Sequence, residues 1–177
     1  MKALTHKDII KQLMEELGIK NPMSCPRLQK IVVSAGIGKL AQSDKKIVKD
    51  VVENLKLITG QNPNIRKARL SISNFKLREG QPVGVSVTLR GEHMYQFLHK
   101  LANIVLPRVR DLKPLSPKSF DGNGNYSIGI RDHLVFPEIN PDDIVISHGM
   151  QINLQTSAKN NEEGFALLKK YNLPFKK

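Results

Sequence analysis

The chain has 177 residues with 28 Lys or Arg against 16 Asp or Glu, a formal net charge of +12 and a pI of about 9.9. Apolar residues make up 40%, which excludes wholesale disorder and predicts one packed domain over residues 1–177. No apolar run approaches the roughly 18 residues that span a membrane. The lone Cys25 offers no internal disulfide, so we expect a reduced, cytoplasmic chain with a polyanionic partner, most often nucleic acid.

Hydrophobic periodicity predicts the elements in chain order. An N-terminal helix stopped by Gly18, followed by a linker, fills residues 1–26. A strand over 27–36, a helix over 43–60 and a short strand over 65–68 follow. After a basic loop, strict alternation predicts a strand over 83–90, and a third helix runs from Met94 until Pro107 ends it.

Residues 107–143 differ in character, because Pro and Gly recur throughout them. A loop of this length is usually functional or disordered. Tyr126, Ile128, Ile130 and Phe136 argue against disorder, so we expect a long ordered insertion before the last strand, at 150–156. A helix over 161–171 closes the chain.

The order β-α-β-β-α-β predicts an α+β, ferredoxin-like antiparallel sheet with helices on one face. The other face would carry small, uncharged side chains from two strands: Gly84, Ser86, Thr88, Gln151, Asn153 and Gln155. An antiparallel sheet often leaves one face to water. Solvated faces usually carry Lys and Glu, however, so the amide and hydroxyl composition favours a binding face.

Motifs for other chemistry fail on spacing. The segment Ala35-Gly-Ile-Gly-Lys39 lacks the four-residue gap of a phosphate-binding loop and the third glycine of a dinucleotide fingerprint. The five histidines show no metal-ligand spacing, and no nucleophile has a paired base. We therefore expect no catalytic residue, no metal site and no cofactor.

Cations cluster beside the predicted face and its loop. Arg66, Lys67 and Arg90 flank the strands, whereas Arg108 and Arg110 follow the third helix. The loop between the strands carries Phe75, Lys76 and Arg78, where an aromatic ring could stack on a base or anchor the loop. Two such clusters on irregular backbone favour RNA over an ordinary solvated surface.

Several long motifs resemble the bacterial large-subunit ribosomal protein L5 family. They are Ser71-Ile-Ser-Asn-Phe-Lys-Leu-Arg-Glu-Gly80, Val87-Thr-Leu-Arg-Gly-Glu92, Leu106-Pro-Arg-Val-Arg-Asp111, the segment 115–127, Phe136-Pro-Glu-Ile139 and Leu173-Pro-Phe175. The resemblance covers nearly the whole chain from Asn21 onward.

The resemblance implies a structural, non-enzymatic component of the 50S central protuberance that binds 5S rRNA and helps attach it. It also implies contacts to 23S rRNA, to P-site tRNA through the loop 71–82, to other central-protuberance proteins, and to small-subunit protein S13 across an intersubunit bridge after Asp132. Thr88 and Gln61 match the family's 5S-binding positions. Ser34 stands where the family usually has Asn, so its shorter side chain would contact RNA directly or through water.

Two alternatives remain on the residues alone. An RNA-modifying enzyme of the same fold would need a His, Lys or carboxylate cluster beside the RNA face, which neither alternating strand supplies. A general polyanion binder would discriminate little between RNAs, and a competition assay separates it from a specific rRNA-binding protein.

Overall fold

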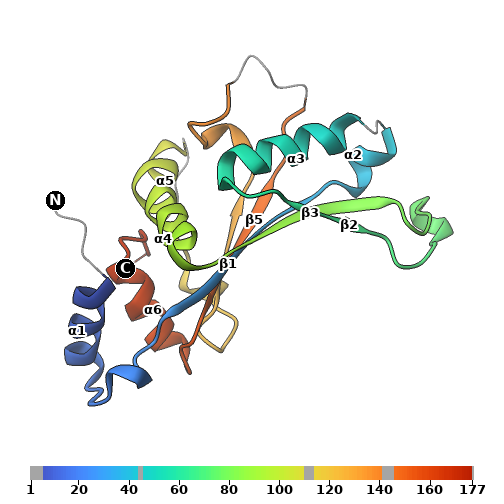
Figure 1. Cartoon of the computed structure of the whole chain (residues 1–177). Coiled ribbons are helices and arrows are strands. Elements are labelled where there is room, and N and C mark those ends of the chain that lie inside the picture. The colour runs from blue at the N-terminus through green and yellow to red at the C-terminus, as the bar shows by residue number, and fades with distance from the viewer. Residues whose placement is uncertain (1–5, 44–45, 110–113, 141–145, 177) are drawn as a thin grey trace.

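The computed structural model describes residues 6–43, 46–109, 114–140 and 146–176 (Figure 1). For residues 6–8 and 42–43 it describes the backbone only. Five antiparallel strands form one sheet, in the order β2-β3-β1-β5-β4. Their bounds are β1 Leu28–Gly36, β2 Asn64–Lys67, β3 Pro82–Leu89, β4 Tyr126–Ile130 and β5 Met150–Thr156.

Helices cover one face of this sheet and one of its ends. The helices are α1 His6–Leu17, α2 Gly38–Ser43, α3 Lys46–Thr59, α4 Gly91–Lys100, α5 Leu106–Arg108 and α6 Asn161–Lys170. In Figure 1, α2 to α5 lie on one side of the sheet, while α1 and α6 gather where β1 begins. The short helix α2 was not predicted, since the glycines around it were interpreted as a turn.

The predicted topology is confirmed. The chain follows β1-α3-β2-β3-α4-β5, and the order β2-β3-β1-β5 is that of the ferredoxin-like split unit. The helical face is apolar because each strand alternates: Ile31, Val33, Val87 and Ile152 are among the buried side chains that it contributes to the core. Burying that face on α3 and α4 leaves the opposite face of the sheet uncovered by them.

The third helix does not end at Pro107, as predicted, but continues through it to Arg108. The preceding residues, Leu101–Val105, form a π-helical turn, in which the N–H of Leu106 donates to the carbonyl of Leu101. In this wider turn each N–H bonds to the carbonyl five residues earlier instead of four, which changes the hydrogen-bonding pattern of the backbone. Pro107, which has no N–H to donate, is accommodated directly after the turn.

The insertion contains regular structure that the sequence interpretation missed. Strand β4 lies inside it and pairs with β5 along its whole length, from Tyr126↔Leu154 to Ile130↔Met150. The insertion therefore adds a fifth strand at the sheet edge, although the prediction that it is ordered holds for its described part. Residues 110–113 and 141–145 lie outside the described residues.

A smaller hydrophobic cluster joins α1 to α6. It consists of Ile9, Leu13, Cys25, Ala166 and Leu167. Cys25 is buried there, and burial raises the pKa of its thiol; it behaves as a small apolar residue. Within the described ranges, no helix has the length and apolar character needed to cross a bilayer.

Candidate nucleic-acid interface

The open face of the sheet presents side chains in rows that run across the strands, because directly paired residues of antiparallel strands share a face. One row joins Gly129, Gln151, Ser34, Ser86 and Asn64. The next row joins Ser127, Asn153, Val32 and Thr88. The predicted site residues Ser34 and Thr88 therefore lie on one face, on the neighbouring strands β1 and β3.

These two rows carry only hydroxyl, amide, glycine and valine groups. Both Ser34 and Thr88 are half-buried, so their hydroxyls lie close to the sheet surface rather than on long, mobile stems. Such a surface repels no phosphate, and hydroxyls and amides can both donate to and accept from sugar and base edges.

Arg66 brings a cation onto this face. It lies in β2 opposite Gly84, and its Nε donates a hydrogen bond to the Ser86 hydroxyl at 2.9 Å. The bond uses one of the five N–H groups of a guanidinium. The positive charge is thus placed beside uncharged side chains at the sheet margin.

A register shift in the pairing of β2 with β3 occurs at the neighbouring cation, Lys67. Successive strand residues normally point to opposite faces, but the pairing slips between Arg66 and Lys67, so that Lys67 lies opposite Pro82. The extra residue is Val83, so β3 is the bulged strand. Lys67 is exposed next to Arg66 at the end of β2.

Arg90 continues the same alternation beyond the end of β3. Its backbone is extended, with φ −141° and ψ 164°, immediately before α4. Two residues after Thr88, it lies on the open-face side and is exposed. Arg66, Lys67 and Arg90 therefore border the uncharged rows.

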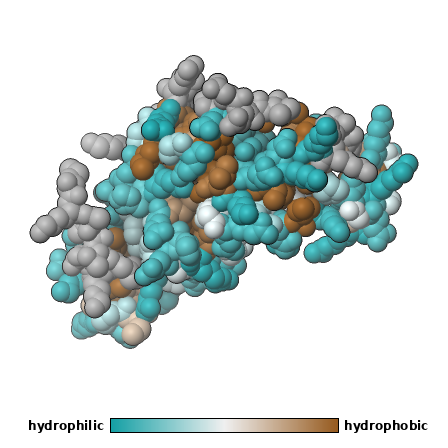
Figure 2. All heavy atoms as spheres, turned by 45° about the horizontal axis from the view of Figure 1, so that its top comes forward, coloured by the Kyte–Doolittle hydropathy of each residue, from teal (hydrophilic) through white to brown (hydrophobic). Residues whose placement is uncertain are grey.

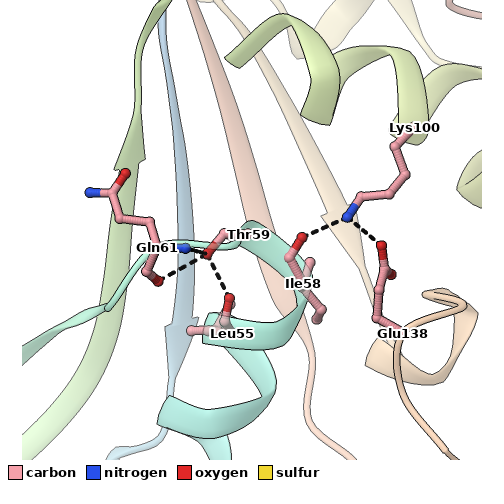
Figure 3. A network of polar contacts seen from close by, with 6 residues as sticks. All are labelled: Leu55, Ile58, Thr59, Gln61, Lys100 and Glu138. Carbon is pink, nitrogen blue, oxygen red and sulfur yellow. Dashed lines mark hydrogen bonds and ion pairs between the residues drawn. The ribbon is translucent and has the colours of Figure 1, made fainter. Parts of the chain in front are cut away.

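Gln61 lies in the turn between α3 and β2. The Thr59 hydroxyl donates to the Leu55 carbonyl at 2.6 Å and accepts from the Gln61 N–H at 3.4 Å. The exposed side chain of Gln61 extends away from this turn (Figure 3). The backbone is thereby fixed while the carboxamide stays available.

The end of α3 is also tied to the insertion. The Lys100 ammonium donates to the Ile58 carbonyl at 2.6 Å and pairs with the Glu138 carboxylate at 2.5 Å (Figure 3). Cations stabilise the carbonyl end of a helix. This contact holds α4, the insertion and the turn that bears Gln61 in one arrangement.

Phe75, Lys76 and Arg78 lie on a separate structure, the hairpin that extends β2 and β3 away from the sheet (Figure 1). Two backbone hydrogen bonds between Ile72 and Leu77, of 2.9 and 3.1 Å, close its tip. Lys76 adopts φ 50° there. The Phe75 side chain is 71% exposed, so the hairpin presents an aromatic ring among cations.

The remaining predicted cations lie elsewhere. Arg108 is exposed at the end of α5, in the helical layer rather than on the open face. Arg110 lies outside the described residues. Figure 2 views the molecule with that layer turned toward the reader, and the projecting hairpin end is mainly hydrophilic from this side.

The structure adds polar residues that sequence reasoning left out of the face. Strand β4 contributes Ser127 and Gly129, and β2 contributes Asn64. The alternation of Tyr126, Ile128 and Ile130 with Ser127 and Gly129 was the signal that could have found β4. Among the described residues, no three His, Cys, Asp or Glu side chains gather as metal ligands.

Comparisons with known proteins agree along the chain. Residues 21–78 match the family model described as ribosomal protein L5, and residues 82–175 match the model for the C-terminus of the same ribosomal family. Proteins named large ribosomal subunit protein uL5 are similar throughout. That of Anaeromyxobacter sp. (strain Fw109-5) is 53% identical over 96% of this chain and 94% of its own length, and that of Halothermothrix orenii is 50% identical over the same shares. The protein from Fusobacterium nucleatum is 53% identical over 96% and 92%.

Proposed function

The chain belongs to the ribosomal protein L5 family and is a structural, non-enzymatic constituent of the large ribosomal subunit in the cytoplasm; from this premise we propose that it binds 5S rRNA through the open face of its sheet. The observation that carries the proposal is the pair of uncharged rows bordered by Arg66, Lys67 and Arg90. Together with Ser34, Gln61 and Thr88, these cations form the proposed 5S rRNA site within a single RNA-binding domain.

The binding mechanism has two parts. The uncharged rows fix the register of the RNA through shape and hydrogen bonds to sugar and base edges, since A-form RNA is recognised mainly through its wide minor groove and 2′-hydroxyls. The surrounding cations supply affinity that falls with salt as condensed counterions are released. The uncharged rows therefore provide selectivity for the RNA, and the surrounding cations provide most of the affinity.

The β2–β3 hairpin serves a second partner, P-site tRNA. Its tip projects from the sheet, and Phe75, Lys76 and Arg78 offer a stacking surface with charge beside it. Arg108 and Arg110 contact 23S rRNA. The insertion after Asp132 meets protein S13 of the small subunit at an intersubunit bridge, next to other proteins of the central protuberance.

Reconstitution tests the proposal. Large-subunit particles assembled without this protein should lack 5S rRNA, and adding the purified chain together with 5S rRNA should restore it to the particle. Incorporation of 5S rRNA to the same level without the protein would contradict the proposed function.

A further inference from the structure

One hydrogen bond on the open face orients an amide of the second uncharged row, which the proposed function does not name as an individual RNA contact. Ser127 in β4 lies directly opposite Asn153 in β5, and its hydroxyl donates to Asn153 Oδ1 at 3.0 Å. The carbonyl oxygen of the carboxamide is therefore engaged within the sheet. Its two N–H groups then remain to donate elsewhere.

From this geometry we propose that Asn153, oriented by Ser127, is a further RNA-contacting residue that donates to an acceptor on the minor-groove edge of 5S rRNA. The inference rests on the proposed function of the same face. It extends the site from β1, β2, β3 and the segments next to them across to β5 and β4.

The position of Asn153 suits a shared ligand. It lies in the same row as Thr88, with Val32 of β1 between them. Two strand spacings amount to about 10 Å. A single RNA helix lying on the face can therefore reach both residues, because its minor groove is wide and shallow.

The surroundings of Asn153 leave it open to a polar ligand. Gln151 and Gln155 flank it on the same face of β5, so three amides follow one another along the strand. Across from Gln151 lies Gly129, where an added Cβ would meet no atom within 4 Å. The packing of the fold therefore does not require glycine at this position. Because glycine has no side chain, nothing projects from β4 beside the amides of β5.

The chemical class of the acceptor follows from the amide. RNA displays ribose 2′-hydroxyls and base-edge acceptors in its minor groove. A neutral N–H donor at a fixed height can discriminate among these, whereas a Lys or Arg at this position would favour any phosphate. Asn153 is thus assigned to selectivity rather than to salt-dependent attraction.

The substitution Asn153→Asp removes the outward donor and adds one negative charge. The carboxylate still accepts the Ser127 hydrogen bond and has nearly the same shape, but it lacks the N–H groups and faces the RNA with a negative charge. We expect 5S rRNA affinity to fall about tenfold at fixed salt. Ser127→Ala, which removes the orienting hydroxyl, should lower it about threefold.

Asn103→Asp is the matched control. Asn103 is exposed in the helical layer, where its Nδ2 donates to the His99 carbonyl, and the substitution changes net charge by the same amount. Equal losses for Asn103→Asp and Asn153→Asp would overturn the inference, because charge alone would then explain both. The inference would also be overturned if both folded variants, Asn153→Asp and Ser127→Ala, bound 5S rRNA as tightly as the wild type does. If the wild type still bound 5S rRNA selectively, the proposed function would stand. Failure of the wild type to select 5S rRNA would overturn both.

Discussion

Arg66 and Ser86 join the edge strand β2 to its neighbour β3 on the open face, with the guanidinium Nε donating to the serine hydroxyl at 2.9 Å. The contact couples the two kinds of group on which the RNA mechanism depends, a charge at the margin and a hydroxyl within the rows.

Replacing Thr88 by Val tests a hydroxyl within the rows. The shape and β-propensity of the side chain are kept, while one hydrogen bond to RNA is lost. We expect 5S rRNA affinity to fall by about 1–2 kcal/mol, or roughly 5- to 30-fold. Filter binding measures the loss, thermal unfolding verifies the fold, and unchanged affinity in a folded variant would remove Thr88 from the site.

Replacing Arg78 by Ala tests the hairpin separately. Its tip projects away from the rows, so Arg78 contributes to the binding of free 5S rRNA only through general electrostatic attraction. Affinity for free 5S rRNA should therefore change less than about twofold. Binding of P-site tRNA to ribosomes carrying the variant should weaken. A large loss of 5S affinity would show that the hairpin, rather than the sheet face, holds 5S rRNA.

The contact between Gly124 and Gly164 predicts a purely structural effect. A Cβ on Gly164 would lie 2.5 Å from the Gly124 carbonyl oxygen and 2.8 Å from its Cα, both backbone atoms. Gly164→Ala should therefore destabilise the protein by about 2 kcal/mol, within the range for overpacking. Denaturant unfolding measures this.

Gly129→Ala provides the control for that experiment, since an added Cβ there meets nothing within 4 Å and the backbone has no positive φ. Its expected effect is neutral, or stabilising by about 0.5 kcal/mol through reduced freedom of the unfolded chain. Equal destabilisation at both positions would refute the packing explanation.

Stability should fall in mild acid because of two histidines. His133 and His148 are buried and stack with ring centroids 4.0 Å apart. Burial, with the neighbouring His133, lowers the pKa of His148 to about 4; burial also lowers that of His133, against the nearby Asp132. The lowered pKa makes the unfolded state bind more protons below about pH 6.5, so stability is full above that pH and is lost toward pH 4.

Between pH 7 and pH 5, His148 alone should account for a loss of about 2 kcal/mol in the free energy of unfolding. Denaturant unfolding at the two pH values measures the loss. The variant His148→Phe, which keeps a flat ring but cannot be protonated, should show a smaller difference between them. An equal difference in the variant would assign the acid sensitivity to other groups.

The local pattern was enough to predict the main strands and the split topology, because Val83 to Leu89 and Met150 to Thr156 alternate without interruption. The strand pairings that place individual side chains on the open face were less predictable. The register slip that sets Lys67 opposite Pro82, and the pairing of Ser127 with Asn153, arise from tertiary pairing. Pro107 likewise ended the helix in the prediction, because the π-helical turn before it leaves no clear signal in sequence.

The most direct test of the sheet-face mechanism is a titration of the purified protein with 5S rRNA and with an unrelated RNA of equal length, at several salt concentrations. We expect tight binding of 5S rRNA that persists at moderate salt and exceeds binding of the other RNA at every concentration. Recognition by the uncharged rows would be contradicted if binding were weak, equal for both RNAs and lost for both as salt rises. General attraction to a basic surface would then be enough to explain the binding.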